Sequence, residues 1–357
     1  MRHCLVAFLI TVVACSGSQT SEPSTPVDAP VPAAPPDSPP ATPAPSAVAS
    51  AWDQAKLDEL AAYAESKSTK ALLLVAGDQP VLERYFGGAD ASFTRDVASV
   101  QKSVTSMLAA IAIGKGLFKL DDTVTSSLGV GWSNAAEAAE AQITMRHLLT
   151  MTSGLDANLG YAAPAGSAWL YNDDAFYRVR LVIEKKTGRE MDALAHEWLF
   201  DRIGMTTSTF DRRLTKDSKG LPVVGLRTSA RDLALFGRLL RARGTWNGET
   251  IVAAPFVDVA TSTSQELNQS YGFLFWLNGK SGGLLPPSTP FTGPLVPSAP
   301  ADAFAALGAS DQKLYVVRSL DVVFVRLGDS AGETRNALSS FDEELWKRII
   351  AAKTSPK

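Results

Sequence analysis

Residues 99–116 read SVQKSVTSMLAAIAIGKG, and this stretch decides the fold. Its run MLAAIAI is continuously apolar and stops at Gly114 and Gly116, a pattern that predicts a buried helix ended by glycine. Ser99 and Lys102 form an S-x-x-K motif at the entry of that helix. Helical side chains three residues apart share one face, with Cβ atoms about 5–6 Å apart, so the amine can accept or relay the hydroxyl proton. The stretch therefore predicts a central helix that begins with a serine nucleophile and a basic partner.

The motif also has a simpler interpretation, in which Ser99 is only a helix cap and Lys102 only a surface lysine. If the pair is functional, burial among apolar neighbours favours the neutral amine of Lys102, the form that a base needs. Ser310 and Lys313 form a second S-x-x-K match, which runs directly into KLYVV. Because KLYVV predicts a strand, where residues three apart point to opposite faces, the second match cannot form the pair.

A third candidate nucleophile is Ser330, in the sequence GDSAG that fits the G-x-S-x-G elbow of α/β-hydrolases. VVFVRL before it predicts a strand, and ETRNALSSF after it predicts a helix. An α/β-hydrolase needs its histidine after the serine, however, and His3, His147 and His196 all precede Ser330. We therefore interpret GDSAG as the turn that leaves a core strand.

Length, composition and charge limit the class of protein. The chain has 357 residues, 45% hydrophobic and 20% charged, which is typical of a globular protein with room for two lobes. Its 34 basic and 37 acidic side chains give a formal charge of −3, and no basic run alternates with aromatic residues. Nucleic acid is therefore not an expected partner. No cluster of His, Cys and carboxylate residues has metal-ligand spacing, so neither a metal nor another cofactor is expected.

The N-terminal residues 1–15, MRHCLVAFLITVVAC, join a basic start to an apolar stretch too short to span a bilayer, which predicts a signal for export. The end of this segment resembles a bacterial lipobox, which would make Cys15 the lipid-bearing residue of a protein anchored to a membrane of the cell envelope. A plain signal peptide or an uncleaved anchor is the alternative. Residues 16–50 hold ten of the 21 prolines and few large apolar side chains, and they are interpreted as a tether.

The remaining chain divides into two predicted lobes. Residues 51–130 and 225–357 carry strand-like runs and helical patterns that predict one α/β lobe built from both ends of the chain. Residues 131–224 hold mainly helical patterns and predict an inserted, mostly helical lobe. The segment 282–303 contains six prolines between two expected strands and is too long for a hairpin turn. It can be read equally as the rim of an active site or as a variable surface insertion.

Five blocks in the same order give the folded chain a specific resemblance: ASVQKSVTSMLAAIAIGKGLFKLDDTV, ITMRHLLTMTSGL, YNDDAFYRVRLVIEKKTG, GLRTSARDLALFGRLLRARGTWNG and AALGASDQKLYVVRSLDVVFVRLG. The sequence resembles the penicillin-recognising serine hydrolases, and within them the class C β-lactamase-like group. That group also contains carboxylesterases, D-peptide hydrolases and 6-aminohexanoate-dimer hydrolases. The resemblance implies an antiparallel sheet flanked by helices, with an inserted and mostly helical lobe.

The resemblance also implies roles for individual residues. Ser99 matches the acylated nucleophile and Lys102 its helper, while Tyr171 matches the tyrosine of the family's Tyr-x-Asn element. We assign the base to the pair of Lys102 and Tyr171, although Tyr171 can instead be a packed aromatic beside Trp169. The oxyanion hole is expected from the backbone N–H groups of Ser99 and of Ala309, which follows Gly308.

Two departures from the family pattern bear on the substrate. Residues 306–308 read Ala-Leu-Gly where the family has Lys-Thr-Gly or His-x-Gly, so a cation that commonly holds a substrate carboxylate is missing. Asp173 stands where the Asn of Tyr-x-Asn is expected and places an anion near the substrate. Both changes favour a small-molecule ester or an uncharged amide as substrate. The alternatives are a β-lactamase or D-alanyl-D-alanine carboxypeptidase, and a binding protein of the same fold with little turnover. His147 is expected in packing and His196 at the surface.

Overall fold

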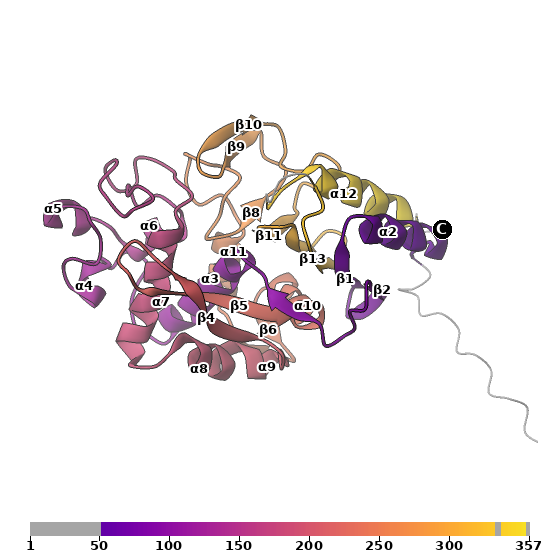
Figure 1. Cartoon of the computed structure of the whole chain (residues 1–357), viewed down its shortest axis with the longest axis horizontal. Helices are drawn as coiled ribbons and strands as arrows, with labels where there is room; N and C mark the ends of the chain where they lie inside the picture. The colour runs from indigo at the N-terminus through magenta and orange to yellow at the C-terminus, as the bar shows by residue number, and fades with distance from the viewer. Residues whose placement is uncertain (1–50, 333–336, 355–357) are drawn as a thin grey trace, which may run out of the picture. The chain divides into compact units, whose positions relative to one another are not determined.

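The computed structural model describes residues 51–332 and 337–354 (Figure 1). The expected signal, Cys15 and the proline-rich tether lie outside the described residues. Within the described ranges, no helix has both the length and the apolar character needed to cross a membrane.

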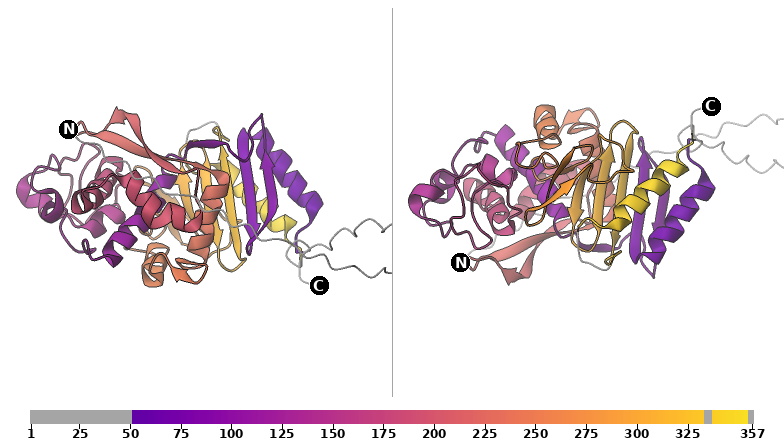
Figure 2. Two further views of the ribbon diagram at one scale, coloured as in Figure 1. Left: turned by 90° about the horizontal axis from the view of Figure 1, so that it is seen from below. Right: turned by 90° about the horizontal axis from the view of Figure 1, so that it is seen from above.

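A six-stranded antiparallel sheet forms the centre of the fold, in the order β2-β1-β13-β12-β11-β8. Its strands are β1 (Thr69–Ala76), β2 (Gln79–Tyr85), β8 (Trp276–Leu277), β11 (Phe304–Gly308), β12 (Gln312–Val317) and β13 (Val322–Gly328). The N-terminal strand β1 pairs directly with the C-terminal strand β13. The inner strands β1, β11, β12 and β13 are buried on both faces, mostly through Leu, Val and Ala, because helices cover both sides of the sheet (Figure 2), whereas the edge strand β2 is largely exposed. The predicted α/β fold with an antiparallel sheet is confirmed.

Helices from the two ends of the chain pack together on one face of the sheet. These are α2 (Gln54–Ser66) and α12 (Ser340–Ala352), which lie side by side in Figures 1 and 2. Helix α10 (Ala230–Arg241) packs against β12 and β13 from the opposite face. Strand alternation separates the two faces: Lys313 of β12 bonds to α12, whereas its neighbour Leu314 reaches Gly237 of α10.

The predicted central helix is α3 (Val100–Gly114), and nearly all of its side chains are buried. It contacts β11 and β12 on one side and α7 (Asp173–Thr187) on another, so it lies between the sheet and the helical part of the chain. The helix ends where the apolar run ends, and Gly116 beyond it adopts a left-handed φ of 75°. The prediction of a buried helix at this position is confirmed.

The rest of the chain is a set of short helices and small sheets. The helices are α4 (Thr125–Leu128), α5 (Glu137–Glu140), α6 (Met145–Leu149), α8 (Met191–Ala195), a π-helix (His196–Phe200), α9 (Asp201–Ile203) and α11 (Ala254–Ala260). The strands are β3 (Thr94–Asp96), β4 (Thr209–Lys216), β5 (Pro222–Ser229), β6 (Thr245–Trp246), β7 (Glu249–Thr250), β9 (Gly282–Leu285) and β10 (Thr289–Thr292). Strand β4 and the start of β5 lie within residues 131–224, where the sequence indicates mainly helix.

Two local predictions differ from the structure. YGFLFWLN at 271–278 contributes only the two-residue strand β8, because Leu274 adopts a left-handed φ of 64° and bends the chain. The helix predicted over ETRNALSSF is wrong where it is described, since α12 begins only at Ser340. Ser339 caps α12 in a capping box with Asp342, and this fixes the start of the helix.

Candidate active site

The pair at the entry of α3 has the geometry of a nucleophile and a helper. Ser99 occupies the N-cap position of α3, yet its side chain makes no capping hydrogen bond within the described chain. Its Oγ instead accepts a hydrogen bond from Lys102 Nζ at 2.9 Å. Ala98, just before it, has a left-handed φ of 49°, a strained conformation of the kind that gathers at functional sites. The structure therefore does not support Ser99 as only a helix cap.

Lys102 is buried and charged rather than buried and neutral. Its side chain is 3% exposed, and its Nζ lies 2.6 Å from Asp173 Oδ1 and 4.8 Å from the centre of the Tyr171 ring. Burial by itself lowers the pKa of Lys102, but electrostatic interactions with Tyr171 and with the Asp173 carboxylate together raise that pKa above its ordinary value. The expectation that burial keeps this amine neutral is wrong, because it considered desolvation without the partner carboxylate.

Asp173 is positioned by the start of α7. Asn172 caps this helix by accepting a hydrogen bond from Ala175 N–H at 3.0 Å, and its amide donates to the Asp156 carbonyl at 2.8 Å. Asp173 is then the first residue of the helix, where a carboxylate is stabilised by the helix dipole. Its side chain is 55% exposed, with one oxygen held by Lys102. The anion expected near the substrate is thus matched by the Lys102 ammonium.

Tyr171 belongs to an aromatic cluster and also lines the pocket that contains Ser99. Its ring stacks on Trp276 with centroids 6.1 Å apart, and Tyr271 meets it edge-on at 6.3 Å. Its backbone N–H donates to the Pro287 carbonyl at 2.9 Å. The packing of Tyr171 against aromatic rings is therefore shown, and the same ring lines the pocket with Ser99; its part as a base stays a prediction.

The end of β11 lies against the backbone of Ser99. A Cβ added to Gly308 would stand 2.3 Å from the Val97 carbonyl oxygen and 3.2 Å from Ser99 N, so only glycine allows this approach. Ala309 follows it and lines the pocket with Ser99. Among the loop and turn hydrogen bonds of the described residues, none is donated by the N–H of Ser99 or Ala309. Two backbone donors are thus available to an oxyanion.

The pocket over Ser99 has a volume of about 410 Å³ and a mainly apolar wall. The proline-rich segment 282–303 contributes Leu285, Pro286 and Thr289 of the β9–β10 hairpin and also Leu295, so it forms part of the wall of this pocket. The described residues that line the pocket include no Lys, Arg, His, Asp or Glu. They are Ser99, Tyr171, Trp276, Leu285, Pro286, Thr289, Leu295, Leu307, Ala309, Ala337 and Leu338.

Other candidates from the sequence lie elsewhere. Lys313 is fully buried in β12 and forms an ion pair with Asp342, so the second S-x-x-K match forms no nucleophile pair, as predicted. Ser330 follows β13, and its Oγ donates to the Gly332 carbonyl at 3.4 Å. His147 helps cap α6, and burial lowers its pKa. His196 bonds to Asp201 near the surface.

Sequence reasoning missed Trp276 and the contribution of 337–338 to the pocket. The aromatic run FLFW gave a signal for the first, but nothing local could place the second beside Ser99. A larger cavity of about 630 Å³ lies between α5 and residues 153–165, and it contains none of the residues named for the site. Within the described ranges, no three His, Cys, Asp or Glu side chains gather as a metal site would require.

An antiparallel sheet covered by helices on both faces, with a serine and a lysine at the head of a central helix, defines a serine hydrolase of the penicillin-recognising type. Residues 60–342 match the family model described as Beta-lactamase, and the chain belongs to that family. Among curated protein sequences, none is detectably similar to this chain.

Solved structures agree with the family fold. A Bacteroides dorei protein provisionally described as a β-lactamase superposes with a TM-score of 0.69 at 17% identity, over 85% of this chain and 100% of the other. D-alanine carboxypeptidase AmpC from Burkholderia cenocepacia gives 0.61 at 17% identity, covering 84% and 98%. EstCE1, a hydrolase with promiscuous acyltransferase activity, gives 0.61 at 16% identity, covering 83% and 97%. At these identities the similarity supports the fold alone.

Proposed function

We propose that this serine hydrolase cleaves an uncharged ester or amide with an apolar acyl group, through an acyl-enzyme on Ser99. One observation carries the proposal: the Lys102–Ser99 pair, 2.9 Å apart, opens into an apolar pocket of about 410 Å³. A pocket of this kind gains free energy from burying hydrocarbon, at about 25 cal/mol per Å² of apolar surface. It offers little to a charged group.

The raised pKa of Lys102 gives Lys102 and Tyr171 different roles in the proposed reaction. A protonated amine cannot accept the serine proton, so Lys102 donates its hydrogen bond to Ser99 Oγ and favours the negative charge that develops there. In this proposal Tyr171 acts as the phenolate: its oxygen takes the proton as Oγ attacks the carbonyl carbon, and the resulting phenol gives that proton to the leaving group. Water then attacks the ester formed on Ser99 with Tyr171 as base again, which releases the acid and restores the serine.

The charges of the site argue against a substrate with a carboxylate. The described pocket lining contains no Lys, Arg or His, and the charge of Lys102 is already matched by Asp173. A carboxylate entering the pocket would lose water without gaining a cation. β-Lactams and D-alanyl-D-alanine peptides are therefore poorer substrates than neutral esters, although a carboxypeptidase has the same fold.

The test is a substrate screen with Ser99→Ala as control. We expect hydrolysis of p-nitrophenyl acetate and butyrate, little turnover of nitrocefin or D-amino-acid amides, and a phosphonate adduct on Ser99 by mass spectrometry. Ser99→Ala should abolish both hydrolysis and labelling, and full activity in that variant would refute the assignment. Nitrocefin turnover equal to ester turnover would identify a β-lactamase. No adduct with phosphonates, esters or β-lactams would favour a binding protein.

We also propose that the protein is exported and attached to the cell envelope through lipid on Cys15. Support comes from the sequence MRHCLVAFLITVVAC and from the ten prolines that follow it before residue 50. Expression with labelled palmitate should mark the full-length protein, whereas Cys15→Ser should be unlabelled and leave the membrane fraction. Equal labelling of both proteins would exclude the anchor.

A further inference from the structure

The turn between β11 and β12 holds an unfavourable backbone conformation directly beside the oxyanion site. Ser310 and Asp311 are consecutive residues with left-handed φ values of 59° and 60°. For residues other than glycine, each such conformation costs of order 1 kcal/mol or more and persists only where surrounding contacts enforce it. Ala309, whose N–H is a predicted oxyanion donor, is the first residue of this turn.

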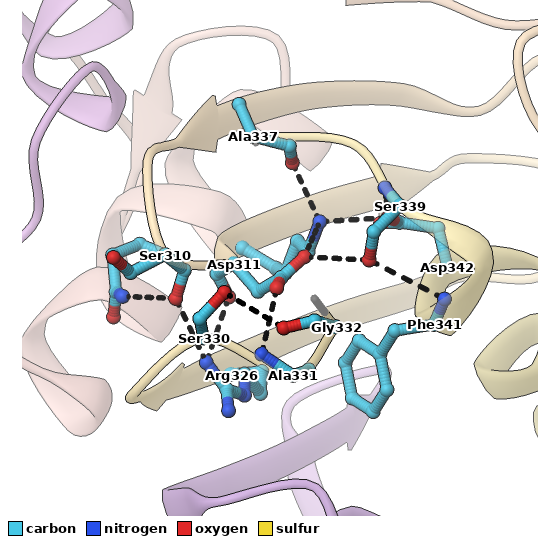
Figure 3. A network of polar contacts seen from close by, with 12 residues as sticks. Ser310, Asp311, Arg326, Ser330, Ala331, Gly332, Ala337, Ser339, Phe341 and Asp342 are labelled. Carbon is cyan, nitrogen blue, oxygen red and sulfur yellow. Dashed lines mark hydrogen bonds and ion pairs between the residues drawn. The ribbon is translucent and has the colours of Figure 1, made fainter. Parts of the chain in front are cut away.

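Two buried side chains bind the carbonyl groups of the turn. The Gln312 amide donates to the Ser310 carbonyl at 2.6 Å and to the Ala309 carbonyl at 3.4 Å. Arg326 Nη1 donates to the carbonyls of both Ser310 and Asp311 at 3.1 Å (Figure 3). Gln312 and Arg326 are both 0% exposed, so these bonds are shielded from competing water. The carbonyls of all three turn residues are thereby held inward.

Lys313 connects the turn to a second part of the pocket wall. Its buried ammonium lies 3.0 Å from Asp311 Oδ1 and 2.7 Å from Asp342 Oδ2, and it donates to the Ala337 carbonyl at 2.6 Å. Asp311 also accepts from Ala331 N–H at 2.8 Å, within GDSAG (Figure 3). Ala337 and Ala309 both line the pocket, so this one lysine fixes the segment at Ala337 and the turn after Ala309 relative to β12.

Stability alone does not explain this cluster. Buried ion pairs often contribute no more than apolar side chains of the same size, because desolvation of the charges offsets their attraction. Catalytic donors, by contrast, must stay within about 0.5 Å of their productive position. A network that binds the turn through three carbonyls and a carboxylate meets that need.

We propose that the buried network of Gln312, Lys313 and Arg326 positions the Ala309 N–H for the oxyanion, an inference that rests on the proposed acyl-enzyme at Ser99. These are positioning residues, since they act through the turn and touch no substrate. The second S-x-x-K match and GDSAG, which supply no nucleophile, then both serve the geometry of the site.

The test uses Gln312→Met, which keeps the side-chain length and removes both hydrogen bonds to the turn, together with the bonds to Gly328 of β13. We expect acylation by p-nitrophenyl butyrate to slow by about tenfold or more, with KM changed by less than about threefold, because an oxyanion donor acts mainly in the transition state. The phosphonate adduct on Ser99 places its P=O oxygen in the oxyanion site, so its ³¹P chemical shift should move away from that of the unaltered protein. Lys313→Met, which releases Asp311 and Ala337, should give the same pattern and serves if Gln312→Met does not fold.

Glu140→Gln is the matched control. Glu140 is 1% exposed and accepts hydrogen bonds from Ser133 N–H and Oγ, away from the pocket. It should lower the unfolding temperature while leaving the acylation rate and the ³¹P shift unchanged. If Gln312→Met and Lys313→Met behave like Glu140→Gln, the network is only structural and the inference fails. If the unaltered protein forms no adduct on Ser99, the proposed function is refuted, and the inference that rests on it is refuted as well.

Discussion

Replacement of Asp173 by asparagine tests the charge state of Lys102, on which the division of catalytic roles depends. Asp173 is the only described carboxylate recorded in an ion pair with this lysine, and their N–O distance is 2.6 Å. Asparagine keeps the shape of the side chain and removes its charge. Because the raised pKa of Lys102 depends on that charge, Asp173→Asn should lower the pKa.

The size of the change follows from the distance and the exposure. Asp173 is 55% exposed, so solvent screens the pair strongly. At 2.6 Å an effective dielectric constant of about 60 gives an attraction of about 2 kcal/mol. Since one pKa unit corresponds to about 1.4 kcal/mol, the pKa of Lys102 should fall by about 1.5 units in the variant.

The assay is the pH dependence of phosphonate inactivation. The ammonium is the active form, so activity is lost as pH rises through the pKa of Lys102, and the alkaline limb should move to lower pH in Asp173→Asn. The same sign applies to stability: the raised pKa stabilises the fold below the unfolded pKa of lysine, and that contribution disappears at higher pH. Asp174→Asn is the matched control, because Asp174 lies beside it on α7 but accepts from Ser218 N–H. An unmoved alkaline limb, or an equal shift in Asp174→Asn, would refute the reasoning.

Three further substitutions test other parts of the site. Gly308→Ala places a Cβ 2.3 Å from the Val97 carbonyl oxygen. Calorimetry should therefore show a loss of about 1–3 kcal/mol in unfolding free energy, and the acylation rate should fall. An unchanged stability and acylation rate would contradict the close approach. Leu285→Trp should fill the pocket and reduce hydrolysis of p-nitrophenyl octanoate at least tenfold more than that of the acetate, whereas a parallel change in both would mean that the hairpin does not contact the acyl group. Ser330→Ala should retain kcat/KM within about threefold. Loss of labelling on Ser99 in this variant would make Ser330 a candidate nucleophile again.

Much of the fold follows from local pattern. The apolar run after Lys102 forms a buried helix because its residues favour helix and leave no polar face for solvent. The runs at 69–76, 312–317 and 322–328 form sheet strands because they are short, rich in Leu and Val, and bury their side chains in the sheet. Ser330 was excluded as the nucleophile of an α/β-hydrolase because every histidine of the sequence precedes it. Helix spacing selected Ser99 over the match at Ser310, whose lysine lies in a strand.

The sequence by itself therefore determined the central helix, the runs that form strands, and the serine and lysine at the helix entry, because each depends on residues close together in the chain. Tertiary structure decided the protonation of Lys102, since its partner Asp173 stands 71 positions away and reaches it only through the packing of α7 on α3. It also decided that the proline-rich hairpin forms a pocket wall and that Ala337 lines the same pocket as Ala309. Charges, burial and pocket walls depend on distances between segments, and those distances exist only once the chain has packed.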